Sequence, residues 1–358
     1  MAKNEQLQEI SQLKDIVSHA KEYGFIYPSS EIYDGLQAVY DYGVYGVELK
    51  NNLKRLWWET MTRLNDNIVG IDAAIFMHPT TWKASGHVDS FNDPMIDNKD
   101  SKKRYRADVL LEEKAAAFEL AGDEGRAKSL LAEMGRLMEA EDLTGIRDLI
   151  NRENIICPIS GTCNWTEVRQ FNLMFESQVG SVAEEATSIY LRPETAQGIF
   201  VNFLNVQKSA RMKVPFGIAQ IGKAFRNEIV ARQFIFRMRE FEQMEMQFFV
   251  RPGSEMEWYH HWADRRMAWH RAIGIPETKL RRHDHEKLAH YANAALDIEY
   301  DFPFGYKEVE GIHSRTDFDL KQHQEFSGKK LQYFDPEINQ SYIPFVVETS
   351  IGADRLFL

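Results

Sequence analysis

The segment 239–250, REFEQMEMQFFV, is the part of the sequence that most restricts the fold. Its residue types favour a β-strand, and successive side chains of a strand point to opposite faces of the sheet. One face then carries Arg239, Phe241, Gln243, Glu245, Gln247 and Phe249, and the other carries Glu240, Glu242, Met244, Met246 and Phe248. Because the first face mixes arginine, phenylalanine, glutamine and glutamate, we expect it to be half buried and half functional.

The residues before this strand are expected to complete a hairpin. The run AFRNE, 224–228, pairs antiparallel with 239–250 through the loop 229–238, which supplies Arg232 and Arg237. Guanidinium groups bind phosphate oxygens and aromatic rings stack on bases, so a nucleoside triphosphate site is one interpretation. The other is a ladder of surface ion pairs, each contributing about 0 to 1 kcal/mol, which is the commoner use of such residues.

Length and composition indicate an ordinary globular protein. The 358 residues predict one large domain with an insertion, or two domains. Hydrophobic residues make up 44% and charged residues 27%, which is atypical of disordered and fibrous proteins. No run approaches the roughly 20 apolar residues that span a bilayer, and the N-terminus, MAKNEQLQEISQLKD, lacks the pattern of a signal peptide. We therefore expect a cytoplasmic protein without a membrane partner.

Charge and cysteine usage exclude two further classes. A net charge of −11 argues against non-specific binding of polyanions, so any nucleic-acid partner has to meet a local basic patch. The two cysteines, Cys157 and Cys163, are too few for a disulfide framework and lack the second pair that a zinc site needs. We expect no zinc.

The pattern along the chain predicts an α+β protein with a mixed sheet and helices beside it. Helices are expected at 1–23, 47–62 and 254–273, with two or three more at 107–150. Residues 71–99 are expected to form a short strand and an irregular loop, because prolines and a glycine interrupt the period. Strand-like runs fill the last two hundred residues. The glycine-rich motifs of Rossmann, P-loop and α/β-hydrolase proteins are absent from the sequence.

Two blocks resemble conserved motifs of class II aminoacyl-tRNA synthetases. Phe225–Glu228, followed by a loop and a strand with Phe241, is similar to motif 2, and the closing ETSIGADRLFL is similar to motif 3. The longer runs YLRPETAQGIFVNF, GKAFRNEI, REFEQMEMQFF, RRHDHEKLAHYA, DIEYDFPFGYKEVEGIHSRTDFDL and WKASGHVDSFNDPM resemble glycyl-tRNA synthetases of the α2 homodimeric type. The matches run from about residue 20 to the last residue in one order, so the chain is identified as a member of that family.

This resemblance implies a class II catalytic fold, a mainly antiparallel mixed sheet flanked by helices. Residues 1–106 would hold the N-terminal part of the catalytic domain with motif 1, residues 107–155 a helical insertion, and residues 156–358 the core with motifs 2 and 3. The family's anticodon-binding domain follows motif 3 and is not in this chain, so we expect a longer protein. Motif 1 builds the homodimer interface in the family, which makes Trp57 and Trp58 candidates for that interface or for the core.

The resemblance also implies a bent ATP molecule lying over the sheet. ATP contacts are assigned to Arg226, Asn227, Glu228, Phe236, Arg237, Met238, Arg239, Glu240, Phe241, Glu308, Val309, Gly352, Ala353, Asp354 and Arg355. Arg226 would hold the α-phosphate, Glu228 the adenine amino group and Phe241 the adenine ring. Arg237 or Arg239 would reach the outer phosphates with Arg355. Glu308 and Glu348 are candidate ligands of magnesium bound with ATP. The expected catalytic residues are Arg226, Arg355 and Glu348.

Glycine has no side chain to grip, so its site has to bind the ammonium group and exclude bulk at Cα. The resemblance assigns glycine contacts to Arg106, Glu194, Phe241, Glu242, Gln243, Met244, Glu245, Glu348, Thr349, Ser350, Ile351 and Gly352. Glu194, Glu245 and Glu348 would surround the ammonium group, with Ser350 close to Cα. An empty pocket with three carboxylates would suffer like-charge repulsion that raises at least one pKa.

The expected partners are glycine, ATP, tRNA(Gly) and a second copy of the chain. Two basic runs are candidates for tRNA contact or for a solvated loop, NKDSKKRYR at 98–106 and KLRRHDHEK at 279–287. The first hypothesis is therefore a ligase that activates glycine with ATP and transfers it to tRNA. The alternative is a non-catalytic, synthetase-like module that binds ATP, tRNA or a protein.

Overall fold

The computed structural model of the chain describes residues 2–180, 187–229, 233–289 and 291–358. It divides into two compact units. The first contains Met1–His87, Met174–Arg226 and Ala231–Leu358, and the second contains Val88–Leu173 with Asn227–Val230. None of the helices in the described residues combines the length and the apolar character that crossing a bilayer requires.

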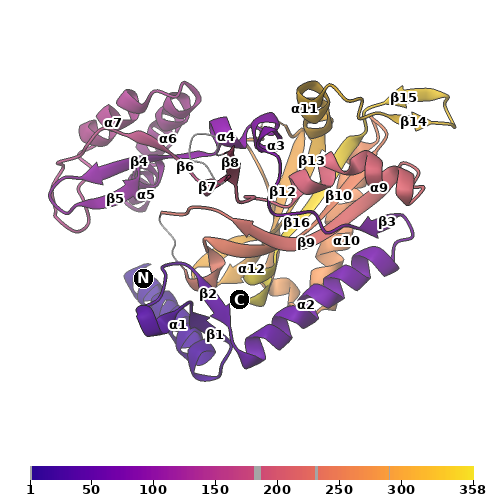
Figure 1. Cartoon of the computed structure of the whole chain (residues 1–358). Coiled ribbons are helices and arrows are strands. Elements are labelled where there is room, and N and C mark those ends of the chain that lie inside the picture. Colours follow the sequence, from indigo (N-terminus) through magenta and orange to yellow (C-terminus); the bar gives the residue numbers. More distant parts are fainter. Residues whose placement is uncertain (1, 181–186, 230–232, 290) are drawn as a thin grey trace. The chain divides into compact units, whose positions relative to one another are not determined.

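A seven-stranded sheet forms the centre of the first unit (Figure 1). Its strands, in spatial order, are β11 (Leu280–Asp284), β12 (Ala294–Phe302), β13 (Gly305–Thr316), β16 (Phe345–Gly352), β10 (Glu240–Val250), β9 (Phe216–Phe225) and β3 (Ile68–Gly70). Every neighbouring pair is antiparallel except β3 and β9, which are parallel. The predicted mixed, mainly antiparallel sheet is confirmed, and so is the pairing of the AFRNE run with 239–250, since Phe225 lies opposite Glu240.

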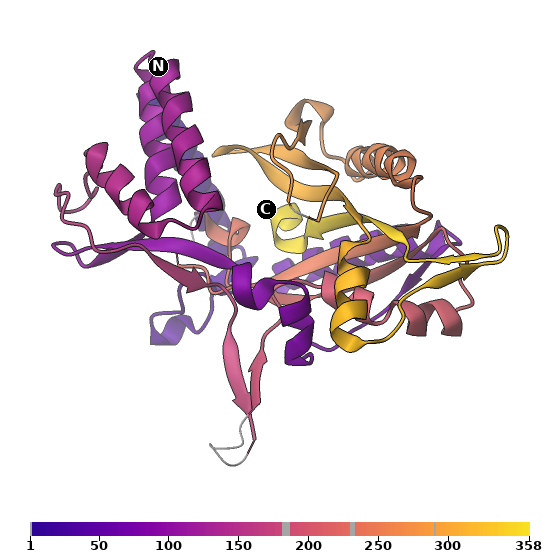
Figure 2. The same ribbon diagram turned by 90° about the horizontal axis from the view of Figure 1, so that it is seen from above.

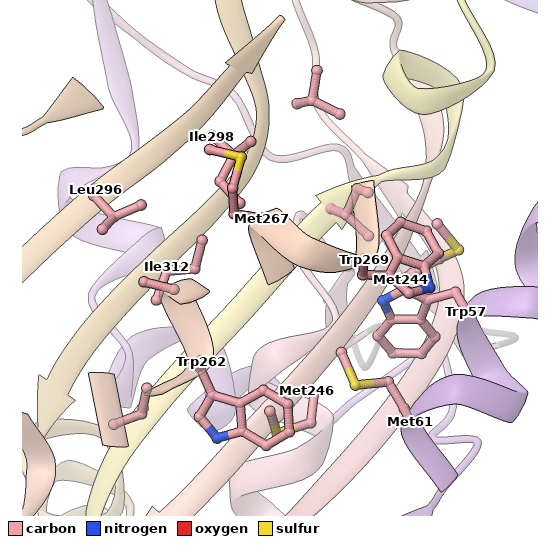
Figure 3. Packing of buried hydrophobic residues seen from close by; sticks show 14 of the residues in the cluster. Trp57, Met61, Met244, Met246, Trp262, Met267, Trp269, Leu296, Ile298 and Ile312 are labelled. Atoms are coloured by element: carbon pink, nitrogen blue, oxygen red, sulfur yellow. The ribbon is translucent and has the colours of Figure 1, made fainter. Parts of the chain in front are cut away.

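One face of the sheet is covered by α2 (Val44–Arg63) and α10 (Glu255–Ala272). Figure 3 shows Trp57 and Met61 of α2 and Trp262, Met267 and Trp269 of α10 packed against side chains of the strands. The strand residues in this core include Met244, Met246, Phe248, Ile298, Ile312 and Ile351. This face of β10 is the one that the alternating pattern predicted to carry its methionines.

The other face of the sheet is covered only at one end. Here α8 (Ala196–Val201), α9 (Phe203–Ser209) and α11 (Phe318–Ser327) pack on Phe249 of β10 and Val346 of β16. Further along this face, the side chains of β10 change from phenylalanine to glutamine and glutamate. Polar positions of the central strands, such as Gln247 and Glu245, therefore lie buried beside the apolar core.

The N-terminal part of the first unit contains α1 (Ala2–Glu22), β1 (Ile26–Pro28), a 3-10 turn (Glu31–Tyr33) and β2 (Tyr40–Tyr42). Both predicted N-terminal helices are present. The apolar face expected along 47–62 is split, however, because Trp57 is fully buried in the core whereas Val47, Leu49 and Leu56 are exposed. Trp57 is therefore a core residue, and Trp58 packs partly buried against the same core.

The loop expected for 71–99 is more regular than predicted. Pro79 begins a short helix, α3 (Pro79–Ala84), where the side chain of His78 accepts from the backbone N–H of Thr80. Proline suits this place because the first turn of a helix leaves its N–H groups unbonded anyway. A further turn, α4 (His87–Ser90), and a strand, β4 (Asn92–Asn98), follow.

The second unit joins a three-stranded sheet to three helices. The sheet has the order β5 (Lys103–Arg106), β4, β6 (Arg169–Asn172), and the helices are α5 (Ala107–Leu120), α6 (Glu124–Glu139) and α7 (Leu143–Arg152). Figure 2 shows α5 and α6 side by side, and their buried residues share one apolar cluster with Ile96 and Trp165. The unit is thus larger than the helical insertion expected at 107–155, because strands on both sides of the helices complete its core.

Three smaller pairs complete the list of strands. β1 pairs with β2, β7 (Glu176–Val179) pairs with β8 (Thr187–Tyr190), and β14 (Tyr333–Asp335) pairs with β15 (Gln340–Tyr342). The last helix, α12 (Ala353–Phe357), follows β16 directly.

A buried ion cluster links α10 to the sheet. Glu310 of β13, which has no exposed surface, accepts from Arg266 Nε at 2.5 Å and contacts His270 Nε2 at 2.7 Å. Burial pushes the pKa of Glu310 up, but the charges of Arg266 and His270 outweigh it and lower the pKa. Glu310 is therefore ionised inside the core.

We expect Glu310→Gln to reduce the free energy of unfolding by roughly 3 kcal/mol, because it leaves the buried Arg266 guanidinium without a counter-charge. Urea unfolding followed by tryptophan fluorescence measures this loss. Glu277→Gln is the matched control, since Glu277 pairs with Arg271 at the surface, where its side chain is 71% exposed, and exposed pairs contribute about 0 to 1 kcal/mol. Equal stability of the two variants would contradict the structural role of the buried cluster.

Candidate active site

This face of the sheet brings polar side chains from three strands together. Antiparallel partners point to the same face, and Gln247 lies opposite Glu348, which in turn lies opposite His313. Glu245 lies opposite Ser350 in the same way. The strand order β13, β16, β10 therefore collects residues that are far apart in the sequence on one surface.

Three glutamates, Glu194, Glu245 and Glu348, form what we call the carboxylate cluster. Gln247 Nε2 connects two of them, since it donates to Glu245 at 2.8 Å and to Glu348 at 2.6 Å. The hydroxyl of Thr195 donates to the second oxygen of Glu245. Glu245 and Glu348 are 2% and 4% exposed, so these carboxylates are held by protein donors almost out of contact with water.

The cluster is balanced by cationic side chains. Arg315 donates to Glu348 at 2.9 Å and also forms a two-bond pair with Asp319. His313 Nδ1 lies 2.7 Å from Glu348, and His87 Nε2 lies 3.5 Å from Glu194. Sequence analysis did not single out Arg315, His313 or His87, because each lies in a run that marks only the family and none has a local spacing that indicates its partner.

The pKa values of the three glutamates diverge. Burial, followed by the charges of Glu348 and Glu194, raises the pKa of Glu245 well above its ordinary value. Burial acts on Glu194 in the same direction, but the charges of His87 and Arg315 outweigh it and lower its pKa to about 2. Arg315 and His313 likewise lower the pKa of Glu348. The expectation that like charges would raise at least one pKa is met at Glu245.

The loop before α8 is held against β9 by Arg192. Arg192 is only 2% exposed. Its guanidinium donates to the carbonyl of Lys223 at 2.6 Å and to that of Ala73 at 2.8 Å. It passes so close to Gly222 that an added Cβ would lie 2.2 Å from Nη2. A glycine at this position therefore allows the loop that carries Glu194 to approach the sheet.

Two arginines lie over phenylalanine rings at the other end of this surface. The Arg226 guanidinium is 5.2 Å from the centre of the Phe241 ring, and its Nε donates to the carbonyl of Pro193 at 3.1 Å. The Arg355 guanidinium is 4.4 Å from the centre of the Phe236 ring and donates to the Glu308 carboxylate at 2.7 Å. Cations over ring faces are held in place without losing their capacity for phosphate.

A β-bulge places Glu308 on this side of the sheet. The register between β12 and β13 shifts after Ile298, so that Glu299 lies opposite Glu308 while Ile298 lies opposite Glu310. Val309, which lies between the two glutamates, is buried in the core. Without the extra residue, strict alternation would put Glu308 and Glu310 on the same face.

Several residues expected to contact ATP or glycine instead have structural partners. Asp354 is buried and accepts from Lys50 at 2.7 Å, from the Tyr42 hydroxyl and from the backbone N–H of Glu242 at 2.7 Å. Glu242 pairs with Lys50 and Lys54 of α2 at 3.1 and 3.0 Å. Both side chains belong to an ion cluster that joins α2 to β10, and their contacts with ATP and glycine stay predictions.

The face of the sheet corrects further assignments. The side chains of Met244 and Ile351 lie in the core on the α10 side, and Thr349 lies opposite Met246 of that core, so none shares the face of Glu245. The side chains of Met238, Val309 and Ala353 are also buried in apolar clusters. Their contacts with ATP or glycine stay predictions.

The remaining ATP residues of the first unit lie near the surface. Arg239 donates to the carbonyl of Gln37 at 3.2 Å, and Glu240 forms an ion pair with Lys223. Arg237 follows the 3-10 turn Phe234–Phe236, and its backbone is extended. Gly352 caps the start of α12. Arg232 lies outside the described residues.

Arg106, Asn227 and Glu228 belong to the second unit. Arg106 donates to Asp108 at 2.6 Å and lies 3.2 Å from Asp93. Although burial opposes it, the bond to Asp108 and the charges of Asp93 and Glu228 raise the pKa of Arg106. The predicted glycine-contacting arginine and the predicted adenine-contacting glutamate are thus electrostatic neighbours in this unit.

The basic runs expected to contact tRNA are neutralised in part by neighbouring carboxylates. In the first unit Lys279 pairs with Asp301 at 2.5 Å, and Arg281 pairs with Glu299 and Arg282 with Asp264 at 2.5 and 2.6 Å. In the second unit Arg104 pairs with Asp97 at 2.7 Å. The sequence therefore overstates the positive charge that these segments present.

The fit of a metal differs between the two expected ligands. Both oxygens of Glu348 already accept from Gln247, His313 or Arg315, so this carboxylate does not suit magnesium, and that assignment is corrected. Glu308 does fit, since its side chain is 44% exposed. Within the described ranges, histidine, cysteine, aspartate and glutamate side chains do not gather in groups of three or more that would hold a metal by themselves.

Comparisons with known proteins agree with this geometry. The family model of the glycyl-tRNA synthetase insertion domain 1 matches residues 93–128 and 120–173, and that of the tRNA synthetase class II core domain (G, H, P, S and T) matches residues 175–358. The chain is 56% identical to a glycine–tRNA ligase of Chlorobaculum tepidum over 97% of its own length and 74% of that protein. It is 53% identical to one of Macrococcus caseolyticus, again over 97% of the chain and 72% of that protein.

A solved structure shares the fold at low identity. Giardia lamblia prolyl-tRNA synthetase in complex with prolyl-adenylate superposes with a TM-score of 0.59 and 13% sequence identity. The match covers 98% of this chain and 52% of the other, so this chain spans about half the length of that protein. This likeness supports the predicted class of fold.

The raised pKa of Glu245 predicts a pH-dependent stability. A carboxyl group with a raised native pKa stabilises the fold fully below its ordinary pKa, and this contribution is lost as pH rises through the native value. Glu245→Gln keeps a neutral side chain at every pH, and its amide can still accept from Gln247. We expect the variant to exceed the wild type in free energy of unfolding near pH 8, because it has no buried carboxyl group that ionises as the pH rises.

Urea unfolding across the range from about pH 4 to about pH 9 measures this difference, which should shrink toward the acidic end. Glu240→Gln is the control on the same strand, because Glu240 is exposed to solvent and paired with Lys223. A Glu245→Gln variant that loses stability at alkaline pH would rule out the neutral, buried state.

Proposed function

The chain belongs to the glycine–tRNA ligases, a family of class II aminoacyl-tRNA synthetases, and from this we propose how its surface activates glycine with ATP. The protein joins glycine to ATP to form glycyl-adenylate and then transfers glycine to tRNA(Gly). The observation that carries the assignment of residues is the carboxylate cluster, which lies on the same face of the sheet as the Arg226–Phe241 pair.

The carboxylate cluster is proposed to bind the ammonium group of glycine. Glu194 and Glu348 are ionised, and the proton on Glu245 gives this site a carboxyl group that can release it when a cation arrives. Ser350 lies opposite Glu245, and Gln243 lies on the same face of β10, so these two side chains are proposed to exclude a side chain at Cα. Selection of the smallest amino acid then rests on charge and on bulk together.

ATP is proposed to lie at the end of this face that carries the two arginine–phenylalanine pairs. Arg226 would move from the Pro193 carbonyl to the α-phosphate, where negative charge grows as the glycine carboxylate attacks. Phe241 would take adenine on its ring, and Arg355 would exchange Glu308 for the outer phosphates. The substrate carboxylate is itself the nucleophile, so positioning and charge stabilisation supply the acceleration.

Magnesium bound with ATP is part of this proposal, with Glu308 as the protein ligand. The ion would neutralise phosphate charge and supply Lewis-acid stabilisation. Its other ligands would come from ATP and water, as is usual for this cation. A cytoplasmic setting is also proposed, because the reaction serves protein synthesis.

A homodimer is proposed from an apolar surface in the N-terminal segments of the first unit. The exposed residues include Ile32 at 87%, Tyr33 at 79%, Val44 at 70%, Tyr45 at 63% and Leu36 at 58%. Apolar side chains gathered in this way on a folded protein mark interaction surfaces. The surface includes the start of α2, the motif 1 helix, whose Trp57 contributes to the core instead.

Arg226→Ala is expected to reduce glycine-dependent pyrophosphate exchange about 100- to 1000-fold, the effect of removing one donor to a developing charge, with circular dichroism unchanged. Lys223→Ala on the same strand removes only a surface pair with Glu240 and should retain exchange. Near-normal turnover of Arg226→Ala would refute its assigned role.

The double variant Ile32→Asp, Val44→Asp is expected to shift the protein from dimer to monomer, because two charges would have to be buried in the apolar surface. Light scattering after gel filtration gives the molar mass directly. Ile159→Asp, which alters an exposed isoleucine of the second unit, should leave the mass unchanged. A wild-type monomer at micromolar concentration would remove the dimer proposal.

A further inference from the structure

The first unit contains a cavity outside the surface described above. It has a volume of about 410 Å³ and lies among α3, α11 and the segment that follows α11. Ala84, Phe326 and Leu331 supply apolar walls, and Thr81, His323 and Lys329 supply polar groups. Pockets that hold small molecules typically have volumes of about 300 to 1,000 Å³ and this kind of mixed lining.

Two polar side chains of the lining are more than nine-tenths buried and lack a partner for one atom. His323 is 6% exposed, and its Nε2 lies 2.7 Å from Gln197 Oε1. Gln197 Nε2 donates to two carboxylates, which identifies Oε1 as the acceptor and His323 Nε2 as the donor. Within the described residues, neither His323 Nδ1 nor the hydroxyl of Thr81, a residue that is 9% exposed, has a hydrogen-bond partner.

Both residues line the cavity, so these two atoms are available to bond to water or to a ligand there. Burial lowers the pKa of His323, and a neutral ring protonated at Nε2 offers Nδ1 as an acceptor. A matching ligand therefore carries a hydrogen-bond donor.

The cavity also presents a positive charge beside an aromatic ring. In the part of the chain that the structure describes, the ammonium group of Lys329 forms no ion pair, and the residue is exposed at the rim. Phe326, with 43% of its surface exposed, offers a ring face nearby. An anionic group and a flat apolar body complement this lining.

We propose that this cavity binds a small aromatic carboxylate that carries a hydrogen-bond donor, and that its occupancy alters glycine binding. The coupling rests on the proposed function of the carboxylate cluster. His323 donates a hydrogen bond to Gln197. The amide of Gln197 in turn donates to Glu194 at 2.9 Å and to Asp319 at 3.0 Å. Asp319 accepts hydrogen bonds from Arg315, and Arg315 also donates to Glu348 and balances its charge. A ligand that moves His323 thus moves the donors that fix two of the three glutamates.

Binding is tested with 4-hydroxybenzoate by ligand-observed NMR titration of the full chain, without glycine or ATP. The expected result is saturable binding, with benzoate and phenol each weaker by about fivefold or more, since each lacks one polar group worth roughly 1 kcal/mol. Absence of binding by all three probes would overturn the proposal.

Two variants locate the binding. Ala84→Phe fills the cavity and should abolish binding, and Lys329→Met removes the charge at the rim and should weaken binding by about tenfold. Lys321→Met, an exposed change elsewhere on α11, is the control and should bind normally. Because Lys329 is a surface residue, its variant remains informative even if Ala84→Phe fails to fold. Undiminished binding by Lys329→Met would place the probe elsewhere.

Coupling is tested by glycine-dependent pyrophosphate exchange with saturating 4-hydroxybenzoate. We expect the KM for glycine to change by about threefold or more in the wild type and by less in His323→Phe, with a smaller effect on kcat. An unchanged KM in the wild type would overturn the coupling. If the wild type failed to exchange even without the probe, the proposed function would fall, whereas the NMR result on the cavity would stand.

Discussion

The structure of the candidate site depends on compensating three glutamates that are buried together. Glu245 and Glu348 share the amide of Gln247 at less than 3 Å, in a region where an isolated carboxylate would be expelled or protonated. Arg315 and His313 keep Glu348 ionised, and protonation removes the charge of Glu245. The charges of this cluster are thus fixed by protein donors rather than by water.

The central sheet makes this arrangement possible by using its two faces differently. On one face α2 and α10 bury methionines and tryptophans, and on the other α8, α9 and α11 cover only one end. The polar residues of β10 therefore follow directly after the end that α8, α9 and α11 cover. Ion clusters also fix the two helices on the first face. Glu310 of the sheet binds Arg266 of α10, and Asp354 binds Lys50 of α2.

The role of an ion pair in this protein depends on whether the pair is buried or lies at the surface. The buried pairs of Arg315 and Arg266 fix the sheet and its glutamates, since neither partner can be solvated separately. The basic runs suggested for tRNA contact are mostly surface pairs with neighbouring carboxylates, which contribute little to stability and reduce the local positive potential. The arginines over Phe241 and Phe236 are intermediate, because their present partners can be exchanged for phosphate.

The sequence by itself determined the mixed antiparallel sheet, the hairpin around Arg226 and the alternation of 239–250. Strand periodicity is a local property, and the resemblance of a motif to a family implies the fold around it. Only the tertiary structure decided which residues of other strands share the face of β10 that the alternation predicted to be functional. Strand order joins His313, Glu348 and Gln247 across more than sixty residues of sequence, and a bulge after Ile298 turns Glu308 toward them. The ion-pair partners of Asp354 and Glu242 were not predicted for the same reason, since a carboxylate meets its partner through the packing of distant elements, which no spacing along the chain encodes.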